Sequence, residues 1–571
     1  MQDDVLRLSL LAMLIGVMVG GAVILFREAI ALIQSVAFGS GSPRLWFHAA
    51  QLPWWHRLLT PTLGGLLVGV WIHAMMPDRR PPTVADAIEA SALKAGRMSF
   101  RAGLWGGVAS ALSIGCGASV GREGPAVHIG ATVGSWLAQI FNLPRRSTQT
   151  LLGCGAAAAV AASFNAPIAG ALFANEVVIG HYALKSFAPV VVSSVIGTIV
   201  SRAWFGDFPA FEVSVLPIRS AWEIPAFLGL GVLAGLTAIL LMRGIRLAEL
   251  GAARLPGPPW LRPAAAGALV GSIAVVLPQV LGIGYGVTEQ ALMGVMPLAL
   301  LAAVCIAKII ATAISLGFGF AGGVFSPSLV IGAMLGGAYG TLLAELPIAT
   351  SESGAYTIIG MGAVAAAVLG APISTSLIVF EMTANYPLTI AVMLAVVVST
   401  AVGRSLHRQS FFTWQLEQRG LDLLGGFQAA LLRSIRVHEV VSPRCEVVSP
   451  DLGLSDLRII VPQSLYGEVF VVGDNGELLG SITFADLSLA AFDRSLDGLV
   501  VAGDLVRRDR PVIASDESLE TALRTIRSAR RVLLAVVDDR ESRRFAGVVH
   551  ERDAMNAYTQ ALLEARRDER S

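Results

Sequence analysis

The residues that point most directly to chemistry are Gly121-Arg122-Glu123-Gly124-Pro125, which place a carboxylate and a guanidinium among long apolar segments. Pro125 suits the first turn of a helix, and the apolar run 126–140 is long enough to form that helix. A helix N-terminus attracts anions because its first N–H groups have no intrahelical partner and its dipole is positive there. Glu123 is then a tethered anion at a place where a free anion could also bind. Taken alone, the motif fits a simple helix cap equally well.

The composition of the 571 residues indicates an integral membrane protein that carries a soluble part. Hydrophobic residues make up 54% of the chain, charged residues only 15%, and the mean hydropathy is +0.67. The net charge of +1 gives no reason to expect a nucleic-acid partner. Residues 1–30 are typical of a first membrane helix rather than a cleaved signal peptide.

Cysteines and reactive side chains give no sign of a metal site or an enzyme. The four cysteines are scattered without metal-ligand spacing, so neither a disulfide framework nor a zinc site is expected. The membrane part holds no nucleophile–base pair and no phosphate-cradling loop. We therefore expect no catalytic residues, no bound metal and no required cofactor.

Apolar segments able to enter a bilayer recur from Leu6 to about Arg404, and several are short or broken by glycine or proline. Interrupted helices at membrane depth are tolerated only where protein covers them or where they line a wet cavity. The pattern therefore indicates a transporter or channel rather than a simple anchor. The clearest segments are 8–26, 58–76, 151–162, 168–179, 190–203, 226–242, 264–281, 298–316 and 390–402.

After Gln415 charged residues become frequent, and short Val/Ile-rich runs alternate with polar helical stretches. This alternation predicts a soluble α/β part. The expected strands are 469–472, 479–483, 532–537 and 546–549, and the expected amphipathic helices are 454–460 and 519–529.

An internal repeat indicates two duplicated halves. When Pro125 is aligned with Pro327, Gly121 matches Gly323, and Ile-Gly-Ala at 129–131 matches Ile-Gly-Ala at 331–333. A second block, Ala-Pro-Ile at 166–168 with Glu176, recurs as Ala-Pro-Ile at 371–373 with Glu381. Such halves in transporters are often inverted about an axis in the membrane plane, with the site at their interface.

The repeat pairs Glu123 with Phe325, each two residues before a helix-starting proline. Two helix N-termini are then expected to converge on one site near the midplane. Convergent positive dipole ends suit an anion without a buried cation, which would hold the ion too tightly for transport. The repeat therefore favours a gate over a simple cap for Glu123.

With both motifs in place, the sequence resembles the CLC family of chloride channels and chloride/proton exchangers. Gly121 to Pro125 is similar to that family's G-K/R-E-G-P signature, and Gly323 to Pro327 to its G-x-F-x-P signature. The resemblance covers residues 1 to about 418 and is closest to the bacterial ClcB-like branch. It implies an all-α polytopic membrane fold of two inverted repeats of broken, tilted helices, and a homodimer with one pore per subunit.

The resemblance also implies residue roles. Glu123 corresponds to the gating glutamate, which competes with the permeating anion. The backbone amides of Val324 and Phe325 would hold the central anion, and those from Arg122 to Gly124 the outer one.

Three positions depart from the family pattern. The family's first anion motif falls near residues 80–84, which contain no glycine or serine, so its hydroxyl is lost unless Thr83 substitutes for it. Phe412 stands where a tyrosine normally contacts the anion. We expect weaker central anion binding, by about 1 kcal/mol per missing neutral hydrogen bond. Val177 occupies the position of the exchangers' inner proton-passing glutamate, and a valine carries no proton. The neighbouring Glu176 is expected to be structural, because Glu381 is its repeat twin.

The C-terminal part resembles a pair of CBS domains. In CBS pairs that bind adenine nucleotides, a Ser/Thr and an Asp three residues later hold the ribose hydroxyls; Thr483 with Asp486 matches, and His550 with Asp553 matches in part. A ligand-free domain that stabilises the dimer is the alternative. The expected divisions are 1–418 membrane domain, 419–436 linker, 437–496 and 497–560 CBS domains, and 561–571 charged tail.

The leading hypothesis from the sequence is a passive, glutamate-gated chloride channel in the bacterial inner membrane, with cytoplasmic CBS domains. A chloride/proton exchanger with an atypical inner proton route is the first alternative. A nucleotide sensor whose membrane part only anchors it is the second. The choice of anion among chloride, nitrate and fluoride stays open at this point.

Overall fold

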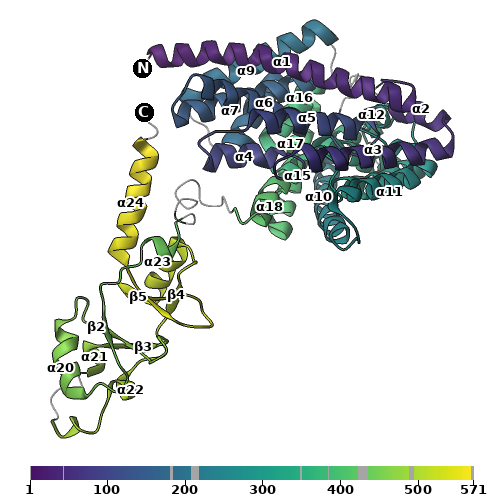
Figure 1. Cartoon of the computed structure of the whole chain (residues 1–571). Helices are drawn as coiled ribbons and strands as arrows, with labels where there is room; N and C mark the ends of the chain where they lie inside the picture. The colour runs from purple at the N-terminus through teal and green to yellow at the C-terminus, as the bar shows by residue number, and fades with distance from the viewer. Residues whose placement is uncertain are drawn as a thin grey trace. The chain divides into compact units, whose positions relative to one another are not determined.

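The computed structural model describes residues 2–42, 44–180, 184–207, 218–346, 350–383, 385–421, 432, 435–487 and 494–567. The chain divides into two compact units, Met1–Gly420 and Leu421–Ser571 (Figure 1). Residues 422–431 and 433–434 of the predicted linker, 488–493 of the predicted first CBS domain and 568–571 of the predicted tail lie outside the described residues.

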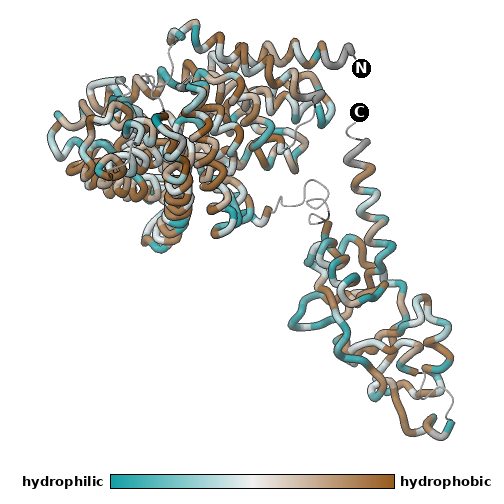
Figure 2. Tube along the Cα trace, turned by 180° about the vertical axis from the view of Figure 1, so that it is seen from behind, coloured by the Kyte–Doolittle hydropathy of each residue, from teal (hydrophilic) through white to brown (hydrophobic). Residues whose placement is uncertain are grey.

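The first unit is helical. Among the described residues, eight helical stretches are long and apolar enough to cross a membrane, and Figure 2 shows the apolar colouring along them. The helices are α1 (Gln2–Phe38), α2 (Leu45–Gln51), α3 (Trp54–Met75), α4 (Val84–Leu93), α5 (Phe100–Gly115), α6 (Glu123–Ile140), α7 (Arg145–Phe164), α8 (Pro167–Phe173), α9 (Leu184–Phe205), α10 (Ile224–Ala253), α11 (Arg262–Val276), α12 (Tyr285–Leu292), α13 (Leu298–Gly317), α14 (Phe325–Ala344), α15 (Ser353–Leu369), α16 (Pro372–Thr383), α17 (Tyr386–His407) and α18 (Phe411–Gln418).

The two halves of this unit repeat the same helix order, since the run from α5 to α9 recurs as α13 to α17. Where they meet, Gly121 and Gly323 form an antiparallel pair in which each N–H donates to the other's carbonyl, at 2.7 and 2.8 Å. An antiparallel pair has a local two-fold axis. The halves are therefore inverted copies, as the repeat in the sequence predicted.

Close helix packing in each half depends on matched glycines. A Cβ at Gly130 on α6 would lie 2.2 Å from the carbonyl oxygen of Gly155 on α7. In the second half, a Cβ at Gly332 on α14 would lie 2.3 Å from that of Gly360 on α15. Small residues let membrane helices approach until their backbones touch, which keeps the helices that start at the site rigid.

Glu176 and Glu381 lock the halves together reciprocally. Glu176 accepts the N–H groups of Ile373 and Ser374 at the start of α16, at 3.1 and 2.8 Å. Glu381 accepts those of Ile168 and Ala169 at the start of α8, at 3.0 and 2.7 Å. Each carboxylate caps a helix start in the opposite half. These caps give both residues the structural role that the repeat predicted.

The second unit contains two three-stranded sheets of the same topology. β1 (Glu446–Val448), β2 (Glu468–Val472) and β3 (Leu478–Thr483) form one sheet, and β4 (Val512–Ala514), β5 (Leu533–Val537) and β6 (Phe545–His550) form the other. In each, the first pair is parallel and the second antiparallel. The accompanying helices are α20 (Leu454–Gln463), α21 (Phe484–Leu487), α22 (Ala502–Leu505), α23 (Leu519–Ser528) and α24 (Glu551–Arg567).

The four predicted strands of this unit are confirmed, whereas β1 and β4 were missed because each has only three residues. One apolar cluster combines residues of both sheets, among them Phe470 and Leu478 from the first and Leu533 and Val548 from the second. The two sheets therefore share a core.

Candidate functional site

Helix N-termini from both halves meet around Glu123. Glu123 is the first residue of α6 and Phe325 the first of α14, and the Gly121–Gly323 pair holds the two starts together. Tyr285, the first residue of α12, reaches the same place. The convergence of α6 and α14 that the repeat predicted is therefore present.

The carboxylate of Glu123 is enclosed by donors. Its side chain is 2% exposed. The Tyr285 hydroxyl donates to Oε1 at 2.8 Å, and the Ser326 hydroxyl donates to Oε2. The Arg122 Nε lies 3.6 Å from Oε1, and its guanidinium carbon lies 5.0 Å from the centroid of the Tyr285 ring. The Glu123 carboxylate is thus surrounded by hydroxyl donors and a positive charge, which are the groups that would also hold a free anion.

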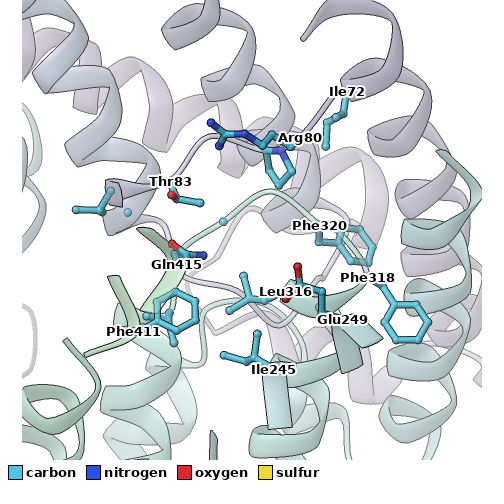
Figure 3. Close-up of a pocket in the computed structure, with 18 of the residues that line it drawn as sticks. Ile72, Arg80, Thr83, Ile245, Glu249, Leu316, Phe318, Phe320, Phe411 and Gln415 are labelled. Carbon is cyan, nitrogen blue, oxygen red and sulfur yellow. The ribbon is translucent and has the colours of Figure 1, made fainter. Parts of the chain in front are cut away.

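A cavity of about 710 Å³ is lined by Glu123, Phe325 and four arginines, among other residues. Of the predicted anion-binding residues, Thr83, Gly124, Val324, Phe325 and Phe412 line it. Arg122 is not in its wall, because its side chain turns toward Tyr285. Figure 3 shows Arg80, Thr83 and Gln415 on one side of the cavity and Phe318 and Phe320 on the other. The charged residues that line the cavity are Arg79, Arg80, Arg262, Arg419, Glu123 and Glu249.

The start of α4 differs from the expectation for Thr83. Thr83 precedes α4, but its N–H donates to Asp86 Oδ2 at 2.7 Å, so a protein carboxylate fills this helix start. Arg80 and Arg419 pair with Asp86 Oδ1 at 2.7 and 2.9 Å. Arg419 also donates to the Thr83 hydroxyl at 3.4 Å. The Thr-x-x-Asp spacing of a capping box was the available sequence signal.

Two phenyl rings, Phe325 and Phe412, line the cavity, and Phe412 is the residue expected in place of a tyrosine hydroxyl. Phe325 packs against Phe164 and Phe173, with ring centroids 4.9 and 6.3 Å apart, and Phe412 packs against Phe411. A phenyl ring offers no hydrogen-bond donor of the N–H or O–H kind. The first N–H groups of α6 and α14 have no intrahelical partner and are the donors expected at this part of the cavity.

Sequence reasoning missed the two hydroxyls that donate to Glu123, those of Tyr285 and Ser326. Ser326 lies within the G-V-F-S-P motif, and the motif itself was the available signal. Tyr285 lies 162 residues from Glu123, and no spacing in the sequence connects them. The site at Glu123 is therefore richer in side-chain donors than the sequence suggested.

Val177, which occupies the position of the exchangers' proton-passing glutamate, lies in a π-helical segment, Ala174–Ile179. Val177 is partly buried there and packs against the apolar core. Both oxygens of the adjacent Glu176 are bonded to the start of α16. Glu176 therefore serves as a cap for α16.

The predicted ribose-binding pair of the second unit is already occupied by protein groups. Thr483 donates through its N–H and hydroxyl to Asp486 Oδ2, and Arg510 donates to both residues. Partial burial pushes the pKa of Asp486 upward, but hydrogen bonds from Thr483 and the charge of Arg510 hold that pKa below its ordinary value. In this arrangement Thr483 and Asp486 bond to each other and to Arg510, and their binding of a ribose stays a prediction.

A buried ion pair lies beside this pair. Glu468, which is 7% exposed, pairs with Arg531 and Arg510 and accepts the Ser481 hydroxyl. These contacts join the first sheet to the segments that flank the second.

The second partial match, His550 with Asp553, also contacts protein groups. The ring of His550 stacks on Tyr466 with centroids 5.2 Å apart, and Asp553 lies 3.6 Å from the Nε of Arg552. Within the described residues, no group of three His, Cys, Asp or Glu side chains could hold a metal ion.

Comparisons with known proteins agree with these features. The family model described as "Voltage gated chloride channel" matches residues 64–404, and the CBS domain model matches residues 502–560. The chain is 36% identical over 419 residues to a putative chloride channel protein ClcB-like of Ralstonia nicotianae, covering 72% of this chain and 97% of that protein. It is 34% identical over 411 residues to the voltage-gated ClC-type chloride channel ClcB of Escherichia coli, covering 71% and 98%.

Solved structures share the fold. A slow cyanobacterial Cl-/H+ antiporter has a TM-score of 0.64 at 23% identity and covers 72% of this chain and 98% of its own. A eukaryotic CLC transporter has a TM-score of 0.64 at 20% identity and covers 97% and 99%. A CLC-type fluoride/proton antiporter has a TM-score of 0.61 at 20% identity and covers 73% and 99%. The predicted membrane fold and CBS pair are confirmed.

Proposed function

Since the chain belongs to the voltage gated chloride channel family, we propose that it transports chloride across a membrane and that Glu123 gates the pathway. The observation that carries this proposal is the buried carboxylate of Glu123 in the wall of the cavity, where α6 and α14 begin. A carboxylate and a chloride ion need the same donors. Glu123 therefore blocks the pathway while it is bound and opens it when it withdraws.

The cavity has the electrostatics that an anion pathway needs. Four arginines line it against Glu123, Glu249 and the nearby Asp86, and the remaining positive charge raises the local concentration of anions. Deeper in, Phe325 and Phe412 leave backbone N–H groups and helix dipoles as the attraction. Weak, shared attraction lets an anion enter and also leave.

We propose passive conduction, because Val177 carries no proton and Glu176 serves as a helix cap. A chloride/proton exchanger with an atypical inner proton route is the second candidate, since two of the structural relatives are described as antiporters. Fluoride as the preferred anion is a further alternative.

Paired flux measurements on vesicles that contain the full-length protein test this proposal. A chloride gradient should drive chloride movement without uphill proton movement. Glu123→Ala should give faster, ungated chloride flux, and Glu345→Ala, an exposed carboxylate at the end of α14, should leave flux unchanged. Uphill proton movement would select the exchanger. Unchanged flux in Glu123→Ala would favour a nucleotide sensor anchored in the membrane.

The remaining assignments extend the proposal. The protein is proposed to work as a homodimer in the bacterial inner membrane, with its CBS pair in the cytoplasm. Adenine nucleotide at that pair stays a prediction, and the bonds of Arg510 to Thr483 and Asp486 support the ligand-free alternative.

A further inference from the structure

Lys308 is a buried cation of the helical unit. It lies on α13, its side chain is fully buried, and it is not among the residues that line the cavity. A buried charge is costly unless hydrogen bonds compensate it, and an ionisable residue inside a membrane therefore points to a role in function. The ammonium group donates to the carbonyl oxygens of Val280 and Gly282, at 2.9 and 2.7 Å. Lys308 thus holds the chain just before α12.

The turn that Lys308 holds leads directly into Tyr285. Gly284 immediately precedes α12, and its φ of +95° lies in the left-handed region that favours glycine. A Cβ at Gly284 would lie 2.9 Å from the Val330 side chain and 3.5 Å from the Lys308 Nζ, so the turn fits closely between α13 and α14. The position of this turn therefore sets where the Tyr285 hydroxyl meets Oε1 of Glu123.

The same helix also holds the chain that leads into Glu123. Thr312 and Ser315 follow Lys308 at spacings of four and three residues, so all three lie on one face of α13, and all are fully buried. The Thr312 and Ser119 hydroxyls are 3.2 Å apart, and the Ser315 hydroxyl accepts the N–H of Ser119 at 3.2 Å. Ser119 lies four residues before Glu123. One helix therefore positions both the donor and the acceptor of the hydrogen bond that holds the gate.

The inverted repeat separates Lys308 from the contacts that both halves share. The alignment of the halves pairs Ser315 with Ser113, and Ser113 accepts the N–H of Ala321 at 3.0 Å, so the serine contact occurs in both. The same alignment pairs Lys308 with Gly106, which has no side chain. The packing common to both halves therefore does not need a cation at this position, and the cation stands in the half that contains α12.

We propose that Lys308 is a positioning residue of the gate: by holding the turn before α12, it keeps the Tyr285 hydroxyl on the Glu123 carboxylate and stabilises the closed pathway. This inference rests on the proposed gating by Glu123 and adds the buried group that sets the strength of the closed state. Lys308 acts through Tyr285 and does not contact the anion. Its loss should loosen the gate and raise chloride flux, whereas the loss of a cation that attracts the anion would lower flux.

Chloride efflux from vesicles that contain the full-length protein tests this role. Lys308→Met keeps the length of the side chain but takes the donor from two carbonyl groups, and it should raise chloride flux about threefold to tenfold. Lys308→Arg keeps the charge and N–H donors and should restore wild-type flux. Gly284→Ala disturbs the same turn from the backbone side without removing a charge, and it should also raise flux.

Two backgrounds show whether Lys308 acts through the gate. Glu123→Ala removes the gate, so adding Lys308→Met to it should leave flux at the level of Glu123→Ala alone. Tyr285→Phe removes the hydroxyl that the turn positions, so adding Lys308→Met to it should change flux little; a rise as large as in the wild type would contradict the route through Tyr285. Ser193→Ala is the control, because it removes a buried hydroxyl that donates to the Cys154 carbonyl at 3.0 Å, between α9 and α7, and should keep wild-type flux.

The outcomes distinguish this inference from the function beneath it. Wild-type or lower flux in Lys308→Met, while Glu123→Ala speeds flux, overturns the positioning role and leaves the gate standing. A fall in flux when Lys308→Met is added to Glu123→Ala also overturns it, because the cation would then act on the anion itself. If Lys308→Met does not fold, wild-type flux in Gly284→Ala overturns the role in its place. If Glu123→Ala leaves chloride flux as in the wild type, the gating proposal fails and the role of Lys308 fails with it.

Discussion

Replacing Glu176 by alanine should destabilise the membrane unit by about 2 kcal/mol, and replacing Glu381 should cost about the same. Each carboxylate accepts two N–H groups from a helix start in the opposite half, at 2.7 to 3.1 Å. A hydrogen bond to a charged acceptor contributes roughly 1.5–3 kcal/mol when buried. Both carboxylates are partly exposed, so solvent screens their charge. The two hydrogen bonds of each carboxylate then contribute about 2 kcal/mol together to the free energy of unfolding.

Tryptophan fluorescence during heating of the full-length protein measures this change selectively. All 10 tryptophans lie at or before position 414, so the signal reports the membrane unit alone. For the unit Met1–Gly420 the melting temperature should fall by roughly 2 °C in either alanine variant. Glu345→Ala, at an exposed position on the same unit, should melt like the wild type.

Glutamine variants decide whether Glu176 has any role beyond the cap. Glu176→Gln and Glu381→Gln each retain one acceptor oxygen, so both should lose less stability than the alanine variants. If both residues are only caps, their flux phenotypes should match. The reasoning is refuted if Glu176→Ala melts like the wild type. It is also refuted if Glu176→Gln alone changes proton movement, because that would assign Glu176 to a proton route.

Three further predictions concern other contacts. Gly323→Ala should abolish anion flux, because its Cβ would lie 2.9 Å from the Gly124 nitrogen and force the two helix starts apart; Gly251→Ala, where a Cβ meets open space, is the control for vesicle flux assays. Arg531→Ala should destabilise the second unit by about 2 kcal/mol, because it removes one of the two arginines that pair with the buried Glu468 and leaves Arg510 and the Ser481 hydroxyl. Hydrogen exchange in β2 should rise in this variant, whereas exchange should change little in the control, the exposed Arg524→Ala. Because the pKa of Asp486 is lowered in the folded state, its ionised form stabilises this unit above its ordinary value of 3.8, and that contribution is lost as the pH falls through the lowered value. The difference in hydrogen exchange between wild type and Asp486→Asn should therefore be largest near pH 6 and should vanish in acid; a constant difference would contradict this pH linkage.

Much of the fold could be predicted from the sequence because the information is local. Apolar length defines a membrane helix, and Gly-x-x-x-Pro marks where α6 and α14 begin. The repeat then placed Glu123 opposite Phe325, since matching positions in inverted halves meet at their common axis. The strands of the second unit followed from Val/Ile-rich runs, except β1 and β4, which are too short to give a periodic pattern.

By itself, then, the sequence located the starts of the two facing helices to within two residues of Pro125 and Pro327, and it placed a carboxylate at one of these starts. Only the tertiary structure decided what that carboxylate contacts. Tyr285 reaches Glu123 across 162 residues, Arg419 reaches Asp86 across 333, and Arg510 reaches Asp486 across 24. Periodicity reports how a segment sits relative to its own neighbours in the chain. Contacts between distant side chains depend on how the two halves close around their axis, and no local pattern records that.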